Sequence, residues 1–384
     1  MKPRRTSTRT ARLLVVAVAG LIMAIAVAAC GSGIESPVTV TVSNEIQLEK
    51  KASGDLEISN WPLYIDKKTV PDFEKATGVN VEYKEDINPN EEFFNKVQPQ
   101  LSNGESGGRS IMVLADYMVA KMIKLGYLQE LNHEALPEVK ANLAKNLRHV
   151  PFDPERRYSV PWQSGMTGII VNKAKAPNVH SICDLFNPEY KGKVDFLNEV
   201  RETVPLVMKC EGVNLEEATE ADWLKAIEKL KEAVSDGQIS RFTGNDYAQD
   251  LTSGNAVAVM GWSGDAVQLQ ADNPELEWRM PTEGCMLWSE DMIIPVGAPN
   301  PTAAEAFMNY VYKPEVQAQI AAYVNYVTPV EGVQEVLAKT EPEVAENHLI
   351  FPPASFTKNC SPTPTLEGEE EKNVIKAFDE VLNG

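Results

Sequence analysis

Apolar residues recur along this chain with two alternating spacings from about residue 56 onward. Residues 56–58 and 79–83 alternate apolar with polar side chains, and this two-residue period is typical of a half-buried strand. Residues 111–114 and 257–260 are short continuous apolar runs, which indicate buried strands. These four segments predict strands in both halves of the chain.

Helical patterns separate the predicted strands. Apolar residues at helical spacing predict helices over 71–76 and 119–123, each followed closely by a glycine, which is a good helix stop. Pro301 and Pro314 each begin a further predicted helix, because proline fits the first turn of a helix, where its missing N–H is not needed.

The clearest helix signal lies between residues 219 and 237. Thr219 and Asp222 have the spacing of a capping box, in which each side chain bonds to the other residue's backbone N–H. The predicted buried face of this helix consists of Leu224, Ile227, Leu230 and Val234.

Strands separated by helices are typical of an α/β fold with largely parallel sheets. The chain has 384 residues and no visible internal repeat, and this length suits two lobes better than one sheet.

Residues 1–29 have the pattern of a secretory signal, with basic residues followed by an apolar run from residue 13 to 29. The run ends in Val27-Ala28-Ala29-Cys30, which resembles the lipobox of bacterial lipoproteins, where a lipid is attached to the cysteine. Residues 30–53 are then the lipidated Cys30 and a flexible tether. The exported protein is expected to be anchored by lipid to the outer face of the cytoplasmic membrane. An uncleaved membrane anchor is the alternative.

Four cysteines remain besides Cys30, an even number that suits disulfides in an oxidising compartment. Four cysteines allow three pairings. We expect Cys183–Cys210 together with Cys285–Cys360, because the first two are close in sequence; four free buried thiols are the alternative.

The formal charge of the chain is −19, and residues 1–29 carry five basic residues and no acidic one, so the remainder carries −24. Such an acidic protein repels phosphate backbones, which disfavours nucleic-acid binding. Four histidines without a His/Cys cluster favour no metal site, and no nucleophile or phosphate-loop motif indicates an enzyme or a cofactor.

Aromatic residues stand beside carboxylates in three segments near predicted strands: Asn60-Trp61-Pro62-Leu63-Tyr64, Gly261-Trp262-Ser263-Gly264-Asp265 and Leu287-Trp288-Ser289-Glu290-Asp291. Ligands of open α/β sheets bind beyond the carboxyl ends of strands. Aromatic faces attract cations, and a carboxylate in an apolar slot orients an ammonium group. The three segments therefore indicate a site for an organic cation, although each Trp could instead be a core residue.

Over residues 54–330 the chain resembles the bacterial polyamine-binding proteins of ABC importers, the spermidine/putrescine family. The resemblance rests on matching residues within the three segments, namely Asn60-Trp61 with Tyr64, Trp262-Ser263-Gly264-Asp265 and Trp288. It rests further, in order, on Phe73-Glu74-Lys75-Ala76-Thr77-Gly78-Val79-Asn80-Val81, Asn90-Glu91-Glu92, Pro151-Phe152-Asp153-Pro154, Tyr158-Ser159-Val160-Pro161, Asp184-Leu185-Phe186, Pro188-Glu189-Tyr190-Lys191-Gly192-Lys193, Arg201-Glu202 and Tyr326-Val327-Thr328-Pro329.

The resemblance implies a two-lobed, periplasmic-binding-protein-like α/β fold with crossover strands near residues 162–167 and 288–291 that act as a hinge. Lobe 1 is expected to comprise residues 54–163 plus 290–335, and lobe 2 residues 164–289 plus 336–384. The ligand is expected in the cleft between the lobes, and the closed monomer is expected to dock on ABC permease subunits.

The resemblance also implies a ligand site. Its expected residues are Trp61, Tyr64, Tyr117, Glu199, Glu202, Trp262, Asp265, Trp288, Glu290 and Tyr326. Glu290 stands where the family usually has Asp, Pro62-Leu63 replace a hydroxyl residue and an acid, and Ala115 replaces a Ser. The missing acid at Leu63 removes one amine anchor, so the ligand is a polyamine or a different small organic cation.

Two other functions remain as alternatives. A receptor of the same fold for an anion or a metal ion would need Arg, Ser and backbone amides, or Tyr, His and Glu ligands, in its cleft. A secreted enzyme on this fold would need a nucleophile and a base there, and Ser263 beside Asp265 has no nearby His in sequence.

Overall fold

The computed structural model describes residues 52–383. The predicted signal peptide and Cys30 lie outside the described residues, as does the predicted tether apart from residues 52 and 53. None of the helices between residues 52 and 383 is long and apolar enough to cross a membrane.

One mixed sheet runs through the described chain in the strand order β2-β1-β3-β9-β4-β7-β5-β6, with β10 beside β9 and β8 beside β4. The strands are β1 (Gly54–Asn60), β2 (Val79–Glu85), β3 (Ile111–Ala115), β4 (Ser159–Asn172), β5 (Val194–Leu197), β6 (Ile239–Thr243), β7 (Ala258–Trp262), β8 (Leu276–Arg279), β9 (Met286–Ile293) and β10 (Ser361–Pro362). All four strands predicted from apolar patterns are present.

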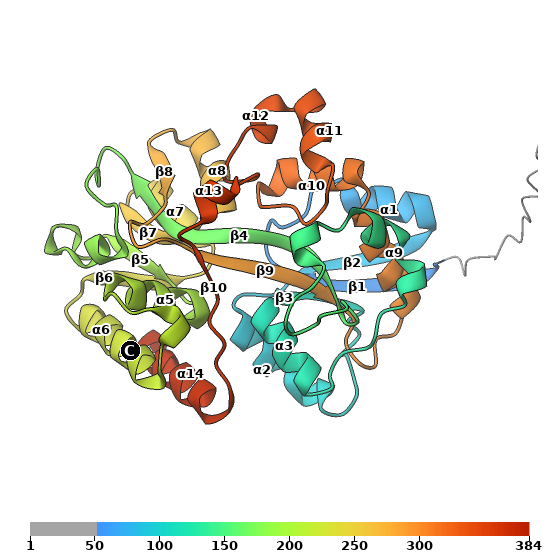
Figure 1. Cartoon of the computed structure of the whole chain (residues 1–384), viewed down its shortest axis with the longest axis horizontal. Helices are drawn as coiled ribbons and strands as arrows, with labels where there is room; N and C mark the ends of the chain where they lie inside the picture. The colour runs from blue at the N-terminus through green and yellow to red at the C-terminus, as the bar shows by residue number, and fades with distance from the viewer. Residues whose placement is uncertain (1–51, 384) are drawn as a thin grey trace, which may run out of the picture. The chain divides into compact units, whose positions relative to one another are not determined.

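The sheet narrows at its middle, where β4 and β9 pass from one lobe to the other (Figure 1). Strand β3 pairs with β9 only at residues 290–293, and β7 pairs with β4 only at residues 167–171. Between these contacts, residues 163–166 of β4 pair with residues 287–290 of β9. These crossover strands confirm the expected two-lobed fold, whereas the exact lobe boundaries stay a prediction.

The expectation of largely parallel sheets holds within each lobe but is wrong at the crossovers. Strand β1 is parallel to β2 and β3, and β5 is parallel to β6 and β7. Strands β4 and β9 run antiparallel to each other and to β7 and β3, because the chain crosses between the lobes in one direction and returns in the other.

Helices cover both lobes (Figure 1). The helices between β1 and β4, together with the first four helices after β9, are α1 (Thr69–Thr77), α2 (Asn90–Leu101), α3 (Asp116–Lys124), α4 (Pro137–Asn142), α9 (Pro301–Val311), α10 (Pro314–Val324), α11 (Val333–Thr340) and α12 (Pro342–Ala345). The remaining helices are α5 (Val200–Cys210), α6 (Glu220–Ser235), α7 (Tyr247–Ser253), α8 (Ser263–Asp272), α13 (Ala354–Thr357) and α14 (Gly368–Asn383). Helix α11 packs on α10, and the last helix, α14, packs on α6.

Helix α6 confirms the predicted capping box, since both reciprocal bonds between Thr219 and Asp222 are formed. Its predicted buried face is partly wrong. Leu224 is 36% exposed, whereas Trp223 is buried beside Ile227 and Leu230. The larger indole occupies the core side, and this turns the neighbouring Leu224 outward by about 100° around the helix.

Two disulfides are formed, Cys183–Cys210 and Cys285–Cys360, which is the pairing expected from the sequence. The second bridge ties the start of β9 to the C-terminal segment, whose strand β10 pairs with β9.

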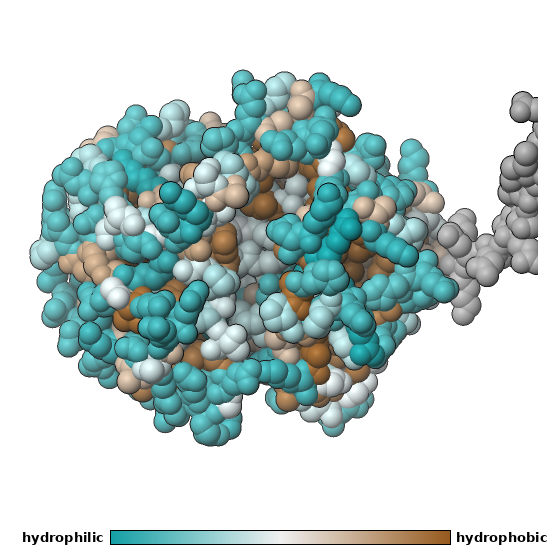
Figure 2. Space-filling model, viewed as in Figure 1, coloured by the Kyte–Doolittle hydropathy of each residue, from teal (hydrophilic) through white to brown (hydrophobic). Residues whose placement is uncertain are grey.

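Hydrophilic side chains cover most of the face drawn in Figure 2, and the surface is hollowed between the two lobes. The described residues form one compact unit.

Candidate functional site

The crossover strands place side chains on two opposite faces of the sheet. Gly165 is the pairing partner of Trp288, and Gln163 is the partner of Glu290. Because alternate residues of a strand point to the same face, these residues share one face, which we call the site face. Strand β7 pairs Trp262 with Thr167, and this register extends the site face into lobe 2.

An aromatic row lies over the site face. The ring of Tyr326 is 5.4 Å from that of Trp288 and 5.2 Å from that of Tyr64, centroid to centroid. Gly165 makes room for this row, because a Cβ at that position would lie 2.3 Å from the Trp288 ring. Gly264 has the same role under Tyr326, where a Cβ would lie 2.5 Å from the ring.

Asp265 lies in the first turn of α8, directly after β7. Its carboxylate accepts hydrogen bonds from Tyr247 Oη at 2.6 Å, Asn245 Nδ2 at 2.7 Å and Tyr326 Oη at 2.6 Å. Burial raises the pKa of Asp265, while these three donors lower it and leave the pKa above its usual value. The carboxylate is therefore held in a fixed position beside the aromatic row.

Glu202 lies in the first turn of α5 and faces the same row. It accepts a hydrogen bond from Trp262 Nε1 at 2.9 Å and another from the Thr167 hydroxyl, which in turn accepts from Trp288 Nε1 at 3.0 Å. Burial raises the pKa of Glu202 to about 7. Trp262 and Trp288 are thus oriented by one carboxyl and one hydroxyl.

Glu199 connects the two lobes. It precedes α5 and accepts hydrogen bonds from the backbone N–H of Asn90 at 3.0 Å and from its side chain at 3.3 Å, at the start of α2. The Tyr117 hydroxyl also donates to it at 3.4 Å. Burial, reinforced by the charge of Glu202, raises the pKa of Glu199 to about 8.

Glu290 is 6% exposed, and burial raises its pKa well above the usual range. The charges of Glu199 and Glu202 add to this increase, so the three carboxyls are electrostatically coupled. Buried carboxyls that lie close together resist ionisation unless a cation enters the site. The arrangement favours a ligand with positive charge.

Nine of the ten predicted site residues are linked by these contacts and charges. Trp61 differs, because its indole N–H donates to the Val113 carbonyl at 3.2 Å within the lobe. Leu63 is 58% exposed at a φ of 58°, and its backbone N–H bonds to Glu85 at 2.9 Å. In this structure the side chain of Leu63 therefore points to solvent and lines no part of the site.

Sequence reasoning missed the neutral residues that orient the acids, namely Asn90, Thr167, Asn245 and Tyr247, as well as Gln163. Alternation around Gly165 in the predicted crossover could have identified Gln163 and Thr167. Tyr247 belongs to the short helix α7, and no sequence pattern places that helix near α8. Asn90 also contacts Ala115, the position that replaces a Ser. The backbone N–H of Ala115 donates to the Asn90 side-chain oxygen at 3.1 Å.

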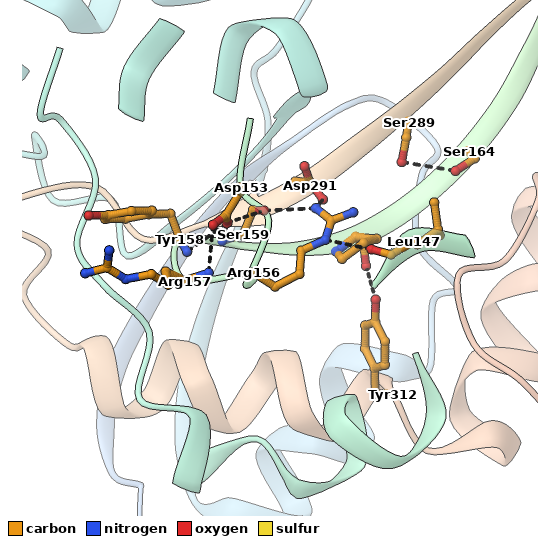
Figure 3. Close-up of polar contacts among 11 residues, drawn as sticks. Leu147, Asp153, Arg156, Arg157, Tyr158, Ser159, Ser164, Ser289, Asp291 and Tyr312 are labelled. Atoms are coloured by element: carbon orange, nitrogen blue, oxygen red, sulfur yellow. Dashed lines mark hydrogen bonds and ion pairs between the residues drawn. The ribbon is translucent and has the colours of Figure 1, made fainter. Parts of the chain in front are cut away.

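The opposite face of the crossover carries a separate polar cluster (Figure 3). Arg156 Nη1 bonds to Asp291 at 2.9 Å, and both side chains are almost fully buried. Tyr312 donates to the Pro161 carbonyl at 2.6 Å, and Ser164 bonds to Ser289 at 3.1 Å. This cluster holds the crossover strands to each other and to lobe 1 on the face opposite the site face.

The chemical capacity of the site follows from this inventory. Aromatic faces and carboxyls suit an aliphatic ammonium ion, which needs both apolar walls and acceptors. In residues 52–383 no group of three or more His, Cys, Asp or Glu side chains is arranged to hold a metal ion.

Comparison with known proteins gives a family match and several relatives. The family model described as bacterial extracellular solute-binding protein matches residues 68–352. The spermidine/putrescine-binding periplasmic protein of Escherichia coli is 30% identical over 311 residues, which cover 80% of this chain and 86% of that protein. The putrescine/agmatine-binding protein of Pseudomonas aeruginosa is 28% identical over 352 residues, which cover 87% and 93%.

Among solved structures, a Listeria monocytogenes protein assigned to spermidine/putrescine ABC transport superposes with a TM-score of 0.78 at 28% identity, covering 85% of this chain and 98% of that one.

Proposed function

The chain belongs to the bacterial extracellular solute-binding proteins, and on that premise we propose that it captures a polyamine-like cation between its lobes and delivers it to an ABC permease. Members of this family are binding receptors that act outside the cytoplasm, so the chain is a receptor and not an enzyme.

One observation carries the choice of ligand class. Asp265, Glu202, Glu199 and Glu290 converge on an aromatic row where the two lobes meet. Burial raises the pKa of all four carboxyls, and neighbouring carboxyls add to the increase at Glu199 and Glu290. An ammonium group favours the ionised form of these buried carboxyls, and its methylene chain packs on the rings. The names of the similar proteins agree with this choice.

A second candidate is a receptor for a different small organic cation. It is favoured by Leu63, which supplies no acid and turns its side chain to solvent. Either kind of ligand places an ammonium group at the acidic end of the site.

The remaining parts of the proposal concern location and assembly. We propose that Cys30 carries a lipid that tethers the receptor to the outer face of the cytoplasmic membrane, that the receptor is a monomer, and that its closed form docks on the permease. Labelling cells with a radioactive fatty acid tests the anchor, since a Cys30→Ser variant should lose both the label and membrane association.

Calorimetric titration of the chain from Gly31 onward tests the function. Putrescine, spermidine, cadaverine and agmatine are the probes, and sulfate and glutamate are the anionic controls. We expect one cation to bind with micromolar or lower Kd, about −8 kcal/mol, and the anions to give no heat. Binding of an anion alone would contradict the proposal.

A further inference from the structure

The site has a second group of polar atoms that the carboxyls do not use. Gln163 is fully buried, and neither its amide oxygen nor its amide nitrogen has a hydrogen-bond partner in the described chain. Trp162 Nε1 is likewise buried and unpartnered within residues 52–383, and the buried Tyr64 hydroxyl lies against Glu290. We call Tyr64, Trp162 and Gln163 the neutral subsite.

Strand register places this subsite within the ligand site. Gln163 is the pairing partner of Glu290, so their side chains leave the sheet on the site face. The Trp162 ring is 6.4 Å from the Tyr64 ring, and Tyr64 in turn packs against Tyr326. The neutral subsite therefore continues the aromatic row toward lobe 1.

The two ends of the site differ in chemistry. At the lobe 2 end, Asp265 and Glu202 are oriented by hydrogen-bond donors, which favour the ionised form of both carboxyls. At the lobe 1 end, burial raises the pKa of Glu290 well above its usual range and disfavours its ionised form, and Leu63 contributes no acid. One end thus suits an ammonium group, and the other suits an uncharged polar group.

The atoms of the neutral subsite narrow the choice further. A buried polar atom without a partner destabilises the protein, and a ligand removes this penalty by completing the hydrogen bond. Gln163 offers one acceptor and one donor side by side, while Tyr64 and Trp162 offer donors. An amide group has the complementary pair, a carbonyl that accepts and an N–H that donates.

We propose that Gln163 is a specificity-determining residue that binds a neutral amide, so that the preferred ligand is a mono-N-acylated diamine with one free ammonium end. This inference rests on the proposed function for the ammonium end of the site. The free amine lies against Asp265 and Trp262, and the acyl amide lies between Gln163 and Tyr64.

The test compares N-acetylputrescine with putrescine by calorimetry on the same protein. We expect N-acetylputrescine to bind at least tenfold tighter. Gln163→Leu, which keeps the size of the side chain, should lower the ratio of the two affinities at least tenfold. Gln163→Glu should reverse the preference, because a new acid at this end suits the second ammonium group.

Controls separate recognition from folding. Ser164→Ala changes the adjacent residue, whose side chain lies on the opposite face, and should leave the affinity ratio unchanged. A reversed preference in Gln163→Glu cannot result from unfolding, and the melting temperature of each variant is measured alongside.

Each outcome decides the question. If the unaltered protein binds putrescine as tightly as N-acetylputrescine or tighter, the inference is overturned and the proposed function stands. If folded protein gives no heat with either compound or with the other polyamines, both fail. A tenfold preference that survives in Gln163→Leu overturns the role of Gln163.

Discussion

Gly165 shows at the scale of one residue why a missing side chain matters to the site. The Trp288 indole lies where a Cβ of residue 165 would stand, and this position lets the indole reach both Thr167 and the ring of Tyr326. A glycine within a strand usually indicates that another group approaches the backbone closely. Here that group is the Trp288 indole, an aromatic wall of the proposed ligand site.

Gly165→Ala is therefore expected to displace Trp288. Overpacking of this kind costs about 1–3 kcal/mol of stability, and it should also weaken ligand binding, because the aromatic wall moves. Urea unfolding and calorimetry of the single variant measure both effects.

The control for this variant is a smaller ring in the same background. Trp288→Phe should cost less affinity when residue 165 is already Ala, so the two changes should be non-additive in a double-mutant cycle. Strictly additive effects would mean that the glycine does not position the indole.

Helix α6 shows at the scale of the element what sequence patterns can and cannot establish. The capping box between Thr219 and Asp222 was predictable, because it depends on residues three positions apart. The direction of the helix's buried face was not, since helical spacing accepts either Leu224 or Trp223. Packing against α5 and α14 decides between them.

The residues of the candidate site likewise fall into those that the sequence could predict and those that it could not. Aromatic and acidic residues such as Trp262 and Asp265 follow directly from β7, so their position at a strand end was predictable. Asn90 and Tyr247 come from elements distant in sequence, and only the packed lobes bring them to Glu199 and Asp265. The register of β4 against β9, which adds Gln163, also required the structure.

Two leucines of α6 test the corrected face. Leu230 is fully buried and Leu224 is 36% exposed. Leu230→Ala should lower the free energy of unfolding by about 2–5 kcal/mol, because it leaves a cavity, whereas Leu224→Ala should cost about 1 kcal/mol or less. Equal losses in urea unfolding would show that the face is assigned wrongly.

The charge balance of the whole molecule links its stability to pH through the site. Burial raises the pKa of Glu199 to about 8 and that of Glu202 to about 7, both above the value of 4.5 for an unperturbed glutamate. Between pH about 4.5 and about 8, the folded protein therefore binds more protons than the unfolded chain. The resulting stability is fully present below pH about 4.5 and is lost as the pH rises through 7 to 8.

Ligand-free protein is accordingly expected to melt at a higher temperature at pH 6 than at pH 8.5. A cation favours the ionised carboxyls, so the increase in melting temperature caused by ligand should be larger at pH 8.5. Melting curves across this range provide the measurement.

A matched pair of variants assigns this pH effect to the site. Glu202→Gln removes one of the titrating groups and should flatten the dependence, while Glu216→Gln, at an exposed position, should leave it unchanged. A dependence that is equally steep in both variants would place its origin elsewhere in the molecule.

The central claim is that a cation is held by the acidic and aromatic groups where the lobes meet, and one comparison tests it most directly. Asp265 and Asp272 both lie on α8, the first at the site and the second exposed at the far end of the helix. Asp265→Asn keeps the shape of the side chain and removes its charge, and Asp272→Asn makes the same change outside the site.

Calorimetry with whichever cation the unaltered protein binds best should show an affinity roughly 30- to 150-fold weaker in Asp265→Asn, since a charge-assisted contact contributes about 2–3 kcal/mol. Asp272→Asn should bind like the unaltered protein. Full affinity in folded Asp265→Asn, or equal losses in both variants, would contradict the account.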